Sequence, residues 1–343
     1  MSRLHLSASA ALFAAATAAT AFAGTVPLPQ AARGGKGITA AVSLDTTCLS
    51  GEAREHVFFD GYSEWTYPDK RRHQISRLDW DLENVFLLGL SGSVRSDFVS
   101  LNFGLWGGLG ADNAGTMEDY DWLMGDSAGR HGPLPEGASE YSRSDDTVTG
   151  VLMADANVSF DLLDKDCAFA LFPFAGLRCE RFEWEDNLDY LIYSSLGWER
   201  LDYGGGKSID YRQEFFQPYL GLGASWTEGR LTLSAYGRFA FVYLGKDHDN
   251  HLLRDYVTED ETRRDAFHDV AYGLGASAEW AFTGNLSAKA GIDWTRYALA
   301  EANVDVLSWD YSGGGGGEKG FGESFAGMEL EYLALSAGLV WHF

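Results

Sequence analysis

The sequence predicts an all-β protein, a ten-stranded antiparallel transmembrane β-barrel with long extracellular loops. Three observations support this fold class. The chain opens on an apolar export signal, segments that alternate apolar and polar residues recur along its length, and short and long polar connections alternate between them. A period of two is expected of a barrel strand with one face towards lipid and the other towards the lumen.

The first 23 residues are predicted to be a signal peptide. Arg3 and His5 form a short polar start, residues 12–22 are apolar and rich in alanine, and Ala21-Phe22-Ala23 has the small-residue pattern of a cleavage site. No later stretch reaches the roughly 18 apolar residues that a membrane-spanning helix requires. Residues 24–343 are therefore expected to form a single barrel domain.

The alternating segments suggest ten strands, an even number as in bacterial barrels. They lie near residues 40–58, 78–83, 99–105, 151–163, 167–184, 215–226, 231–244, 270–282, 286–298 and 333–343. The last segment ends on the aromatic Phe343, which is typical of the terminal strand of bacterial outer-membrane proteins. Asp79, Asp81 and Glu83 share one strand face, and together with Arg238 they are expected to line a lumen closed by salt bridges.

The connections divide into two kinds, as expected for the two sides of a membrane. Residues 91–93, 227–229 and 283–285 are predicted to be tight periplasmic turns, and residues 60–73, 113–147, 186–212, 247–266 and 300–325 to be outer loops. Most tryptophans fall near expected strand ends or on lipid faces, Trp106 and Trp184 among them, so we expect aromatic girdles at the membrane interfaces.

Charge and cysteine content limit the possible partners. The chain has 50 acidic residues against 26 Lys plus Arg, a net charge of −24. This charge excludes nucleic acid as a partner and favours cationic ligands. The three cysteines, Cys48, Cys167 and Cys179, have no metal-binding spacing, so no metal or catalytic thiol is expected. Twelve residues of one strand would separate Cys167 from Cys179 by roughly 40 Å, which excludes a disulfide between them.

Two short acidic patterns carry the chemistry. They are Asp119-Tyr120-Asp121 and Asp247-His248-Asp249-Asn250-His251, and both fall where an expected strand enters a long outer loop. Residues two apart in a strand share a face and lie roughly 6.5–7 Å apart. Two carboxylates that face an Asp/His pair across a cleft can activate a water molecule. Because alternate residues of a strand share a face, Asp247 is expected on the same face as Asp249 and His251. His248 and Asn250 are expected on the opposite face, away from the cleft.

From about residue 51 to 343 the chain resembles the omptin family, the outer-membrane proteases of Gram-negative bacteria. The most specific matches are Gly115-Thr116-Met117-Glu118-Asp119-Tyr120-Asp121-Trp122 and Asp247-x-Asp249-x-His251. Leu78-Asp79-Trp80 and residues 50–55 and 218–222 add support. The resemblance implies a barrel in the bacterial outer membrane that extends well above the outer leaflet, with an active-site groove at its extracellular rim.

The resemblance also implies roles for six residues. Asp119 and Asp121 correspond to the family's acidic pair on one wall of the groove, where they would hold the attacking water. Asp249 and His251 correspond to the Asp–His pair on the other wall: His251 would be the general base, and Asp249 would orient and stabilise its imidazolium. Glu55 and Asp247 would line the pocket for a basic side chain. The implied enzyme is a monomeric aspartic-type endopeptidase for Arg or Lys sites, without metal or cofactor.

The family is known for its need for lipopolysaccharide, held by basic residues on the barrel exterior. Arg181 and Arg263 are the candidates for contacts with lipid phosphates. Glu214 stands where the family pattern has a basic residue, and an acid there repels phosphate, which puts the lipid requirement in question. Two other functions stay open from the residues themselves: a non-enzymatic adhesin whose acidic loops bind a basic partner, and a porin-like channel.

Overall fold

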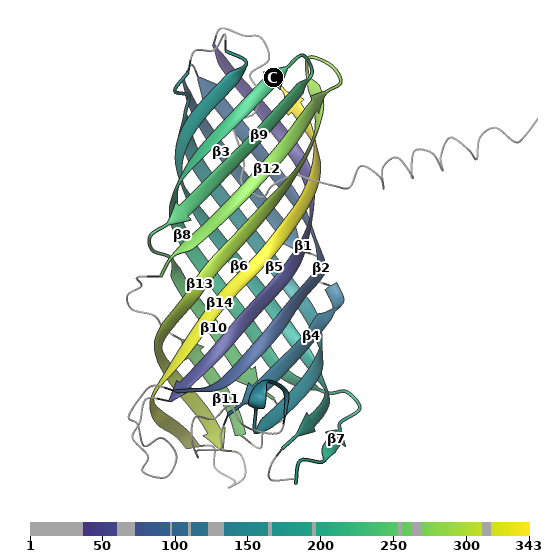
Figure 1. Cartoon of the computed structure of the whole chain (residues 1–343), viewed down its shortest axis with the longest axis vertical. Helices are drawn as coiled ribbons and strands as arrows, with labels where there is room; N and C mark the ends of the chain where they lie inside the picture. The colour runs from purple at the N-terminus through teal and green to yellow at the C-terminus, as the bar shows by residue number, and fades with distance from the viewer. Residues whose placement is uncertain are drawn as a thin grey trace, which may run out of the picture.

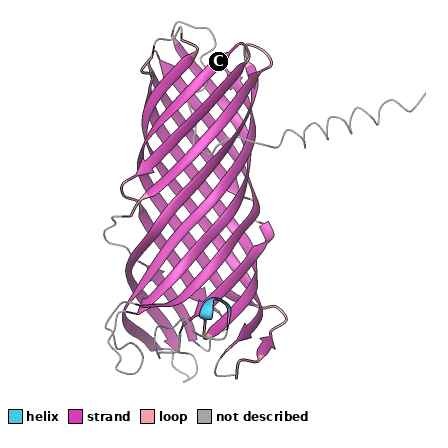
Figure 2. Ribbon diagram, in the orientation of Figure 1, coloured by secondary structure: helices cyan, strands magenta, loops and turns pink. Residues whose placement is uncertain are grey.

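The computed structural model describes residues 37–59, 73–96, 98–108, 111–122, 134–163, 167–193, 197–252, 256–262, 269–310 and 317–343. The predicted signal peptide lies outside them. The described residues form strands almost throughout, with one short turn of 3-10 helix, η1 (Pro135–Gly137) (Figure 2). No helix in this part of the chain is long and apolar enough to cross a membrane.

Antiparallel pairing closes the strands into a ring. The strands are β1 (Ile38–Phe59), β2 (His73–Ser96), β3 (Val99–Gly108), β4 (Ala111–Asp121), β5 (Glu140–Phe160), β6 (Phe169–Ile192), β7 (Arg200–Asp202), β8 (Lys207–Glu228), β9 (Leu231–Ala240), β10 (Leu244–His251), β11 (Tyr256–Thr262), β12 (Ala271–Ala281), β13 (Leu286–Asp310) and β14 (Gly317–His342). β14 pairs with both β13 and β1, which closes the barrel.

At three positions of the barrel, two shorter strands lie end to end and together take the place of one long strand. β4 extends β3 towards the rim and lies between β2 and β5, and β10 likewise extends β9 and lies beside β8. β11 extends β12 and lies beside β13. The three-residue β7 pairs only with β6 among the described strands. With each end-to-end pair counted as one strand, the described residues form the predicted ring of ten antiparallel strands.

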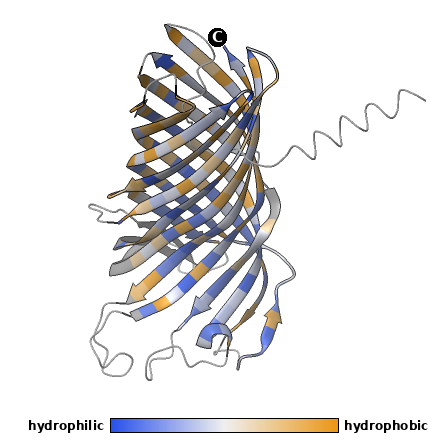
Figure 3. Ribbon diagram, turned by 45° about the horizontal axis from the view of Figure 1, so that its top comes forward, coloured by the Kyte–Doolittle hydropathy of each residue, from blue (hydrophilic) through white to orange (hydrophobic). Residues whose placement is uncertain are grey.

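The barrel is taller than a membrane is thick. β13 has 25 residues and β14 has 26, whereas about 9–11 residues suffice for a tilted strand to cross. The strand ends that flank the long connections lie at one end, which we call the rim, and the C-terminus lies at the opposite end (Figure 1). Large apolar side chains such as Phe86, Leu88 and Leu220 face outward in the half near the terminus. Hydrophilic residues become more frequent towards the rim (Figure 3).

The polarity of the wall inverts between the apolar band and the rim, and this corrects one prediction. Asp79, Asp81 and Glu83 do not line the lumen. The lumen-facing residues of this part of β2 are Leu78, Trp80 and Leu82, which are 4%, 0% and 0% exposed. Above the apolar band the outer surface meets water, so charged side chains point outward and apolar ones pack inside.

Salt bridges nonetheless close the lumen, through residues that the alternation did not single out. Arg178 pairs with Asp155 at 3.3 Å and with Glu180 at 2.7 Å, and all three are buried. The predicted Arg238 is also buried in the lumen, where it pairs with Asp293 at 3.4 Å. Buried charges that are paired in this way form a filled, rigid interior.

Three smaller predictions can be compared with the structure. Residues 91–93, expected to form a turn, lie inside β2, which continues to Ser96. Trp106 and Trp184, expected in the girdles, are buried in the lumen, whereas Trp226, Trp280 and Trp341 are exposed on the outer surface. All three cysteines are free, so Cys167 and Cys179 are not bridged, as predicted.

Candidate active site

The first wall of the site consists of β1, β2 and β4. Asp119 pairs in register with Leu78, and Leu78 pairs with Glu55 on its other side. Asp119 and Glu55 therefore stand at one level on the lumen side, two strand spacings or about 10 Å apart. Asp121 lies two residues nearer the rim, level with Ser76. The Ser76 hydroxyl donates a hydrogen bond to Asp119 at 3.3 Å.

A glycine allows β4 to approach β2 at this position. Gly115 has φ +126°, and a Cβ atom there would lie 2.3 Å from Cβ of Asp81. The carboxylate of Asp81 accepts a hydrogen bond from the backbone N–H of Thr116 at 2.8 Å. The glycine and this hydrogen bond fix the start of the segment that carries Asp119 and Asp121.

An aromatic cluster supports this segment from the outside. Tyr120 and Trp122 alternate with the two aspartates and stack on each other, with ring centroids 6.2 Å apart. The Arg77 guanidinium lies 4.8 Å from the Tyr120 ring centroid and pairs with Glu136 of η1 at 3.0 Å. The Tyr120 hydroxyl donates to Glu118 at 2.7 Å. This backing cluster of Arg77, Glu118, Tyr120, Trp122 and Glu136 restrains the strand that presents the aspartates.

The second wall is β10, and its register matches the parity expected from the sequence. Asp247 and Asp249 are 3% and 2% exposed, whereas His248 and Asn250 lie on the other face. The Asp249 carboxylate is 2.6 Å from Nε2 of His251. A carboxylate in this position orients the imidazole and stabilises its protonated form. The pairing leaves Nδ1 as the ring nitrogen for proton transfer.

An aromatic floor joins the two walls. Tyr211 of β8 pairs in register with Asp249 and stacks across the lumen on Trp80 of β2, with centroids 5.1 Å apart. Trp184 completes the floor at 5.7 Å from Tyr211. Burial raises the pKa of the Tyr211 phenol well above its usual value, and the nearby carboxylates of Asp247, Glu55 and Asp249 raise it further. Acids from both walls thus surround one phenol.

Sequence reasoning missed the residues of this floor and one neighbour. Trp80, Trp184 and Tyr211 were not assigned to the site, nor was the buried Gln213, which pairs in register with Asp247. The segment Tyr211-x-Gln213 has the same i, i+2 spacing as the acidic patterns. Applying strand parity to the segment before Phe215 would have placed both side chains in the lumen.

A buried carboxylate lies behind the first wall. Asp146 of β5 is fully buried, and burial, with the carboxylates of Asp81 and Asp186 nearby, raises its pKa to about 9. The Asp146 carboxyl is therefore protonated at neutral pH. In the part of the chain that the structure describes, no group of three or more His, Cys, Asp or Glu is placed to hold a metal ion.

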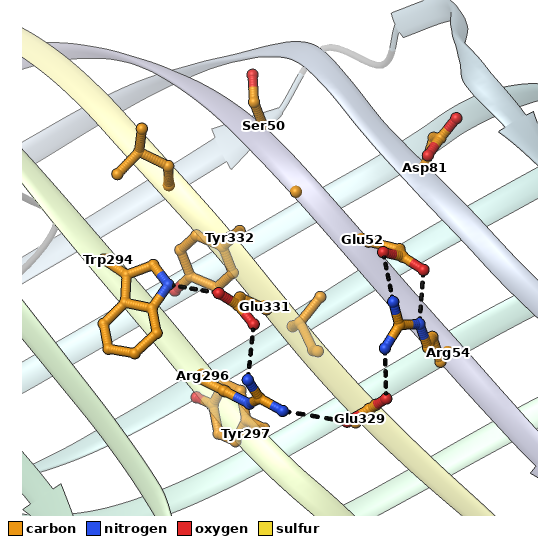
Figure 4. Close-up of a pocket in the computed structure, with 13 residues that line it drawn as sticks. Ser50, Glu52, Arg54, Asp81, Trp294, Arg296, Tyr297, Glu329, Glu331 and Tyr332 are labelled. Carbon is orange, nitrogen blue, oxygen red and sulfur yellow. Dashed lines mark hydrogen bonds and ion pairs between the residues drawn. The ribbon is translucent and has the colours of Figure 1, made fainter.

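A surface depression of about 550 Å³ lies outside the barrel, behind Glu55, and none of the six predicted site residues lines it (Figure 4). Arg54 pairs with Glu52 at 2.6 Å and with Glu329 at 2.9 Å, and Arg296 pairs with Glu331 at 3.2 Å. His56, whose Nε2 lies 3.5 Å from the Glu329 carboxylate, acts together with Arg54 to lower the pKa of Glu329 to about 2. These ion pairs link β13, β14 and β1 on the outer surface.

The predicted lipid contacts are described only in part. Arg181 faces outward from β6, pairs with Glu183, and lies 3.8 Å from Glu214. Its guanidinium is half-exposed beside the outward Leu152. Two carboxylates therefore already balance its charge. Arg263 lies outside the described residues.

The closed antiparallel barrel with its outward apolar band has the architecture of a bacterial outer-membrane protein. The model of the Omptin family matches residues 36–343, and the chain belongs to this family. It is 25% identical over 311 residues to the plasminogen activator of Yersinia pestis, covering 88% of this chain and 89% of that one. It is 24% identical to Protease 7 of Escherichia coli K12, with coverage of 89% and 90%.

The fold agrees with a solved structure of the same family. The crystal structure of outer membrane protease OmpT from Escherichia coli superimposes with a TM-score of 0.72 at 21% sequence identity, over 90% of this chain and 97% of that chain. The protein is therefore an outer-membrane β-barrel of the omptin family, whose named relatives are proteases.

Proposed function

We propose that this protein is an aspartic-type endopeptidase that cleaves peptides and proteins at Arg or Lys, with its active site at the extracellular rim of the barrel. The observation that carries the proposal is the 2.6 Å contact between the buried Asp249 and the half-buried His251, on the wall opposite Asp119 and Asp121. Membership in a family with protease relatives supports the reaction class.

The proposed reaction is attack of a water molecule on the peptide carbonyl. Asp119 and Asp121 accept hydrogen bonds from the water and hold it between the walls. His251 takes one water proton at Nδ1 while the oxygen forms a bond to the carbonyl carbon, and Asp249 stabilises the imidazolium. His251 then returns the proton to the leaving amine as the C–N bond breaks. The sequence of steps consumes one water and needs no other reactant.

Glu55 and Asp247 are proposed to select a basic side chain before the cut bond. Both carboxylates are almost fully buried and face the same phenol of Tyr211. A guanidinium or ammonium group there gains charge-assisted hydrogen bonds that a neutral side chain cannot offer. The net charge of −24 also steers cationic substrates towards the molecule.

Lipopolysaccharide is proposed as an activating lipid, held in part by Arg181. Because Glu183 and Glu214 already pair with or approach this guanidinium, lipid phosphate must compete with them. We therefore expect Glu214→Lys to strengthen activation by lipopolysaccharide. Activation that is unchanged in Glu214→Lys argues against a lipid contact at this position.

The test of function uses the purified barrel, a fluorogenic Arg-Arg peptide, and assays with and without lipopolysaccharide. The wild type should cleave after Arg, and His251→Ala should lose activity by about a thousandfold or more while it still inserts and folds. An unchanged rate in His251→Ala contradicts the mechanism. If a basic partner instead binds without cleavage, and binding survives loss of His251, the adhesin alternative is favoured.

A further inference from the structure

We propose that Gln213 is a third specificity-determining residue of the basic pocket. Its side-chain oxygen accepts a hydrogen bond from an arginine guanidinium and makes the pocket prefer Arg to Lys. The inference rests on the proposed function, because it requires that Glu55 and Asp247 receive the basic side chain of a substrate.

Gln213 lies between the two acids of this pocket. It is fully buried on β8 and pairs in register with Asp247 of β10, so their side chains leave neighbouring strands on the same face. Across the lumen, its Nε2 lies 3.3 Å from the backbone carbonyl oxygen of Arg54, the residue that precedes Glu55. The Gln213 side chain therefore spans from the β10 wall to the β1 wall.

The neighbours of the amide determine which way it points. Nε2 donates to the hydroxyl of Tyr211 at 2.8 Å and faces the carbonyl oxygens of Arg54 at 3.3 Å and Glu329 at 3.5 Å. Carbonyl oxygens only accept hydrogen bonds, so the NH₂ group must occupy this side of the amide. Oε1 points away from them and has no hydrogen-bond partner among the described residues.

A buried amide oxygen without a donor is unfavourable, so such an atom beside a binding pocket indicates that the ligand supplies the donor. Acceptor groups from β1, β8 and β10 lie around the Tyr211 phenol. The carboxylates of Glu55 and Asp247 act on this phenol, and its hydroxyl accepts from Gln213, whose amide oxygen is the third acceptor. A guanidinium offers five N–H donors spread over a planar fork and can reach all three. A lysine ammonium is a compact charge that the two carboxylates satisfy first.

The experiment compares two peptides that differ only in Arg or Lys before the cut bond. In Gln213→Met, which keeps side-chain length without polar atoms, kcat/KM for the Arg peptide should fall about tenfold or more through KM, and for the Lys peptide less than about threefold. Gln217→Met is the matched control. Gln217 lies on the same strand and face, is equally buried, and accepts from Tyr297 at 3.1 Å. Its replacement should leave the Arg/Lys ratio unchanged.

Equal losses for both peptides, or an unchanged ratio, overturn the assignment of Gln213. A shift in the ratio that Gln217→Met reproduces also overturns it, because the effect then belongs to the barrel as a whole. If Gln213→Met does not fold, Gln213→Asn replaces it. The Asn side chain is one methylene shorter, so its oxygen lies farther from the pocket and the Arg/Lys ratio of kcat/KM should fall. An unchanged ratio contradicts the role of Gln213. A wild type that cleaves neither peptide refutes the proposed function instead.

Discussion

Replacement of Asp249 by Asn tests the division of labour within the second wall. We predict that kcat falls by roughly 10³–10⁴-fold while KM for an Arg peptide stays nearly constant. The carboxylate lies 2.6 Å from Nε2 of His251, and the two side chains are 3% and 13% exposed. The pair is therefore short and largely shielded from solvent.

The magnitude follows from the distance. At 2.6 Å and an effective dielectric constant of about 20, opposite unit charges attract by about 6 kcal/mol. The imidazolium of His251 forms only as the water loses its proton, so this attraction lowers the transition state rather than the substrate complex. At about 1.4 kcal/mol per tenfold, this attraction sets an upper limit of roughly 10⁴–10⁵-fold in rate, and the predicted loss of roughly 10³–10⁴-fold lies within it.

The assay measures kcat and KM on a fluorogenic Arg peptide, with circular dichroism and thermal unfolding to verify the fold. Asn250→Ala is the matched control, because Asn250 lies between the pair on the opposite face of β10. It should leave kcat within about twofold, as is usual for a residue outside the reacting group. A loss below tenfold in Asp249→Asn, or a loss confined to KM, refutes the role of Asp249.

Three further predictions concern the pocket, the backing cluster and the buried carboxylate. Glu55→Gln should raise KM for Arg and Lys peptides about tenfold and leave neutral peptides nearly unaffected; equal losses exclude a pocket role. Arg77→Met should lower kcat several-fold without changing the Arg/Lys ratio, with partial rescue in Arg77→Lys, because the guanidinium supports β4 from outside. Asp146→Asn should raise the unfolding temperature at pH 7. The folded pKa of about 9 lies above the ordinary value of 3.8, so the folded state binds the extra proton between these limits and wild-type stability falls as pH rises. A wild-type unfolding temperature that does not depend on pH in this range contradicts the last prediction.

The ring of strands was predictable because alternation is a local property, but alternation does not say which face is inside. The rule that polar faces of a membrane barrel point inward predicts Asp79, Asp81 and Glu83 in the lumen. That rule ends where the wall leaves the lipid. Leu78 and Trp80 then turn into the lumen, where Trp80 is part of the floor, and the acids turn towards water.

The acidic patterns were predictable for the same local reason, whereas the floor was not. Asp249 and His251 are two residues apart, and strand parity alone places them on one face. Trp80 and Tyr211 lie far apart in the chain and meet only because β2 and β8 face each other across the barrel. Neither segment contains a sign of the other: strand parity can place Tyr211 and Gln213 in the lumen, but their contacts with β2 and β1 follow only from the closed fold.

The central claim is that the two walls act on one water molecule, and a double-mutant cycle between Asp121→Ala and His251→Ala tests it most directly. Each single replacement should lower kcat by about a thousandfold or more. Residues that serve one step act as a unit, so the double variant should be no slower than the worse single variant. Losses that multiply to about a millionfold would show that Asp121 and His251 act independently, and the shared-water account would be wrong.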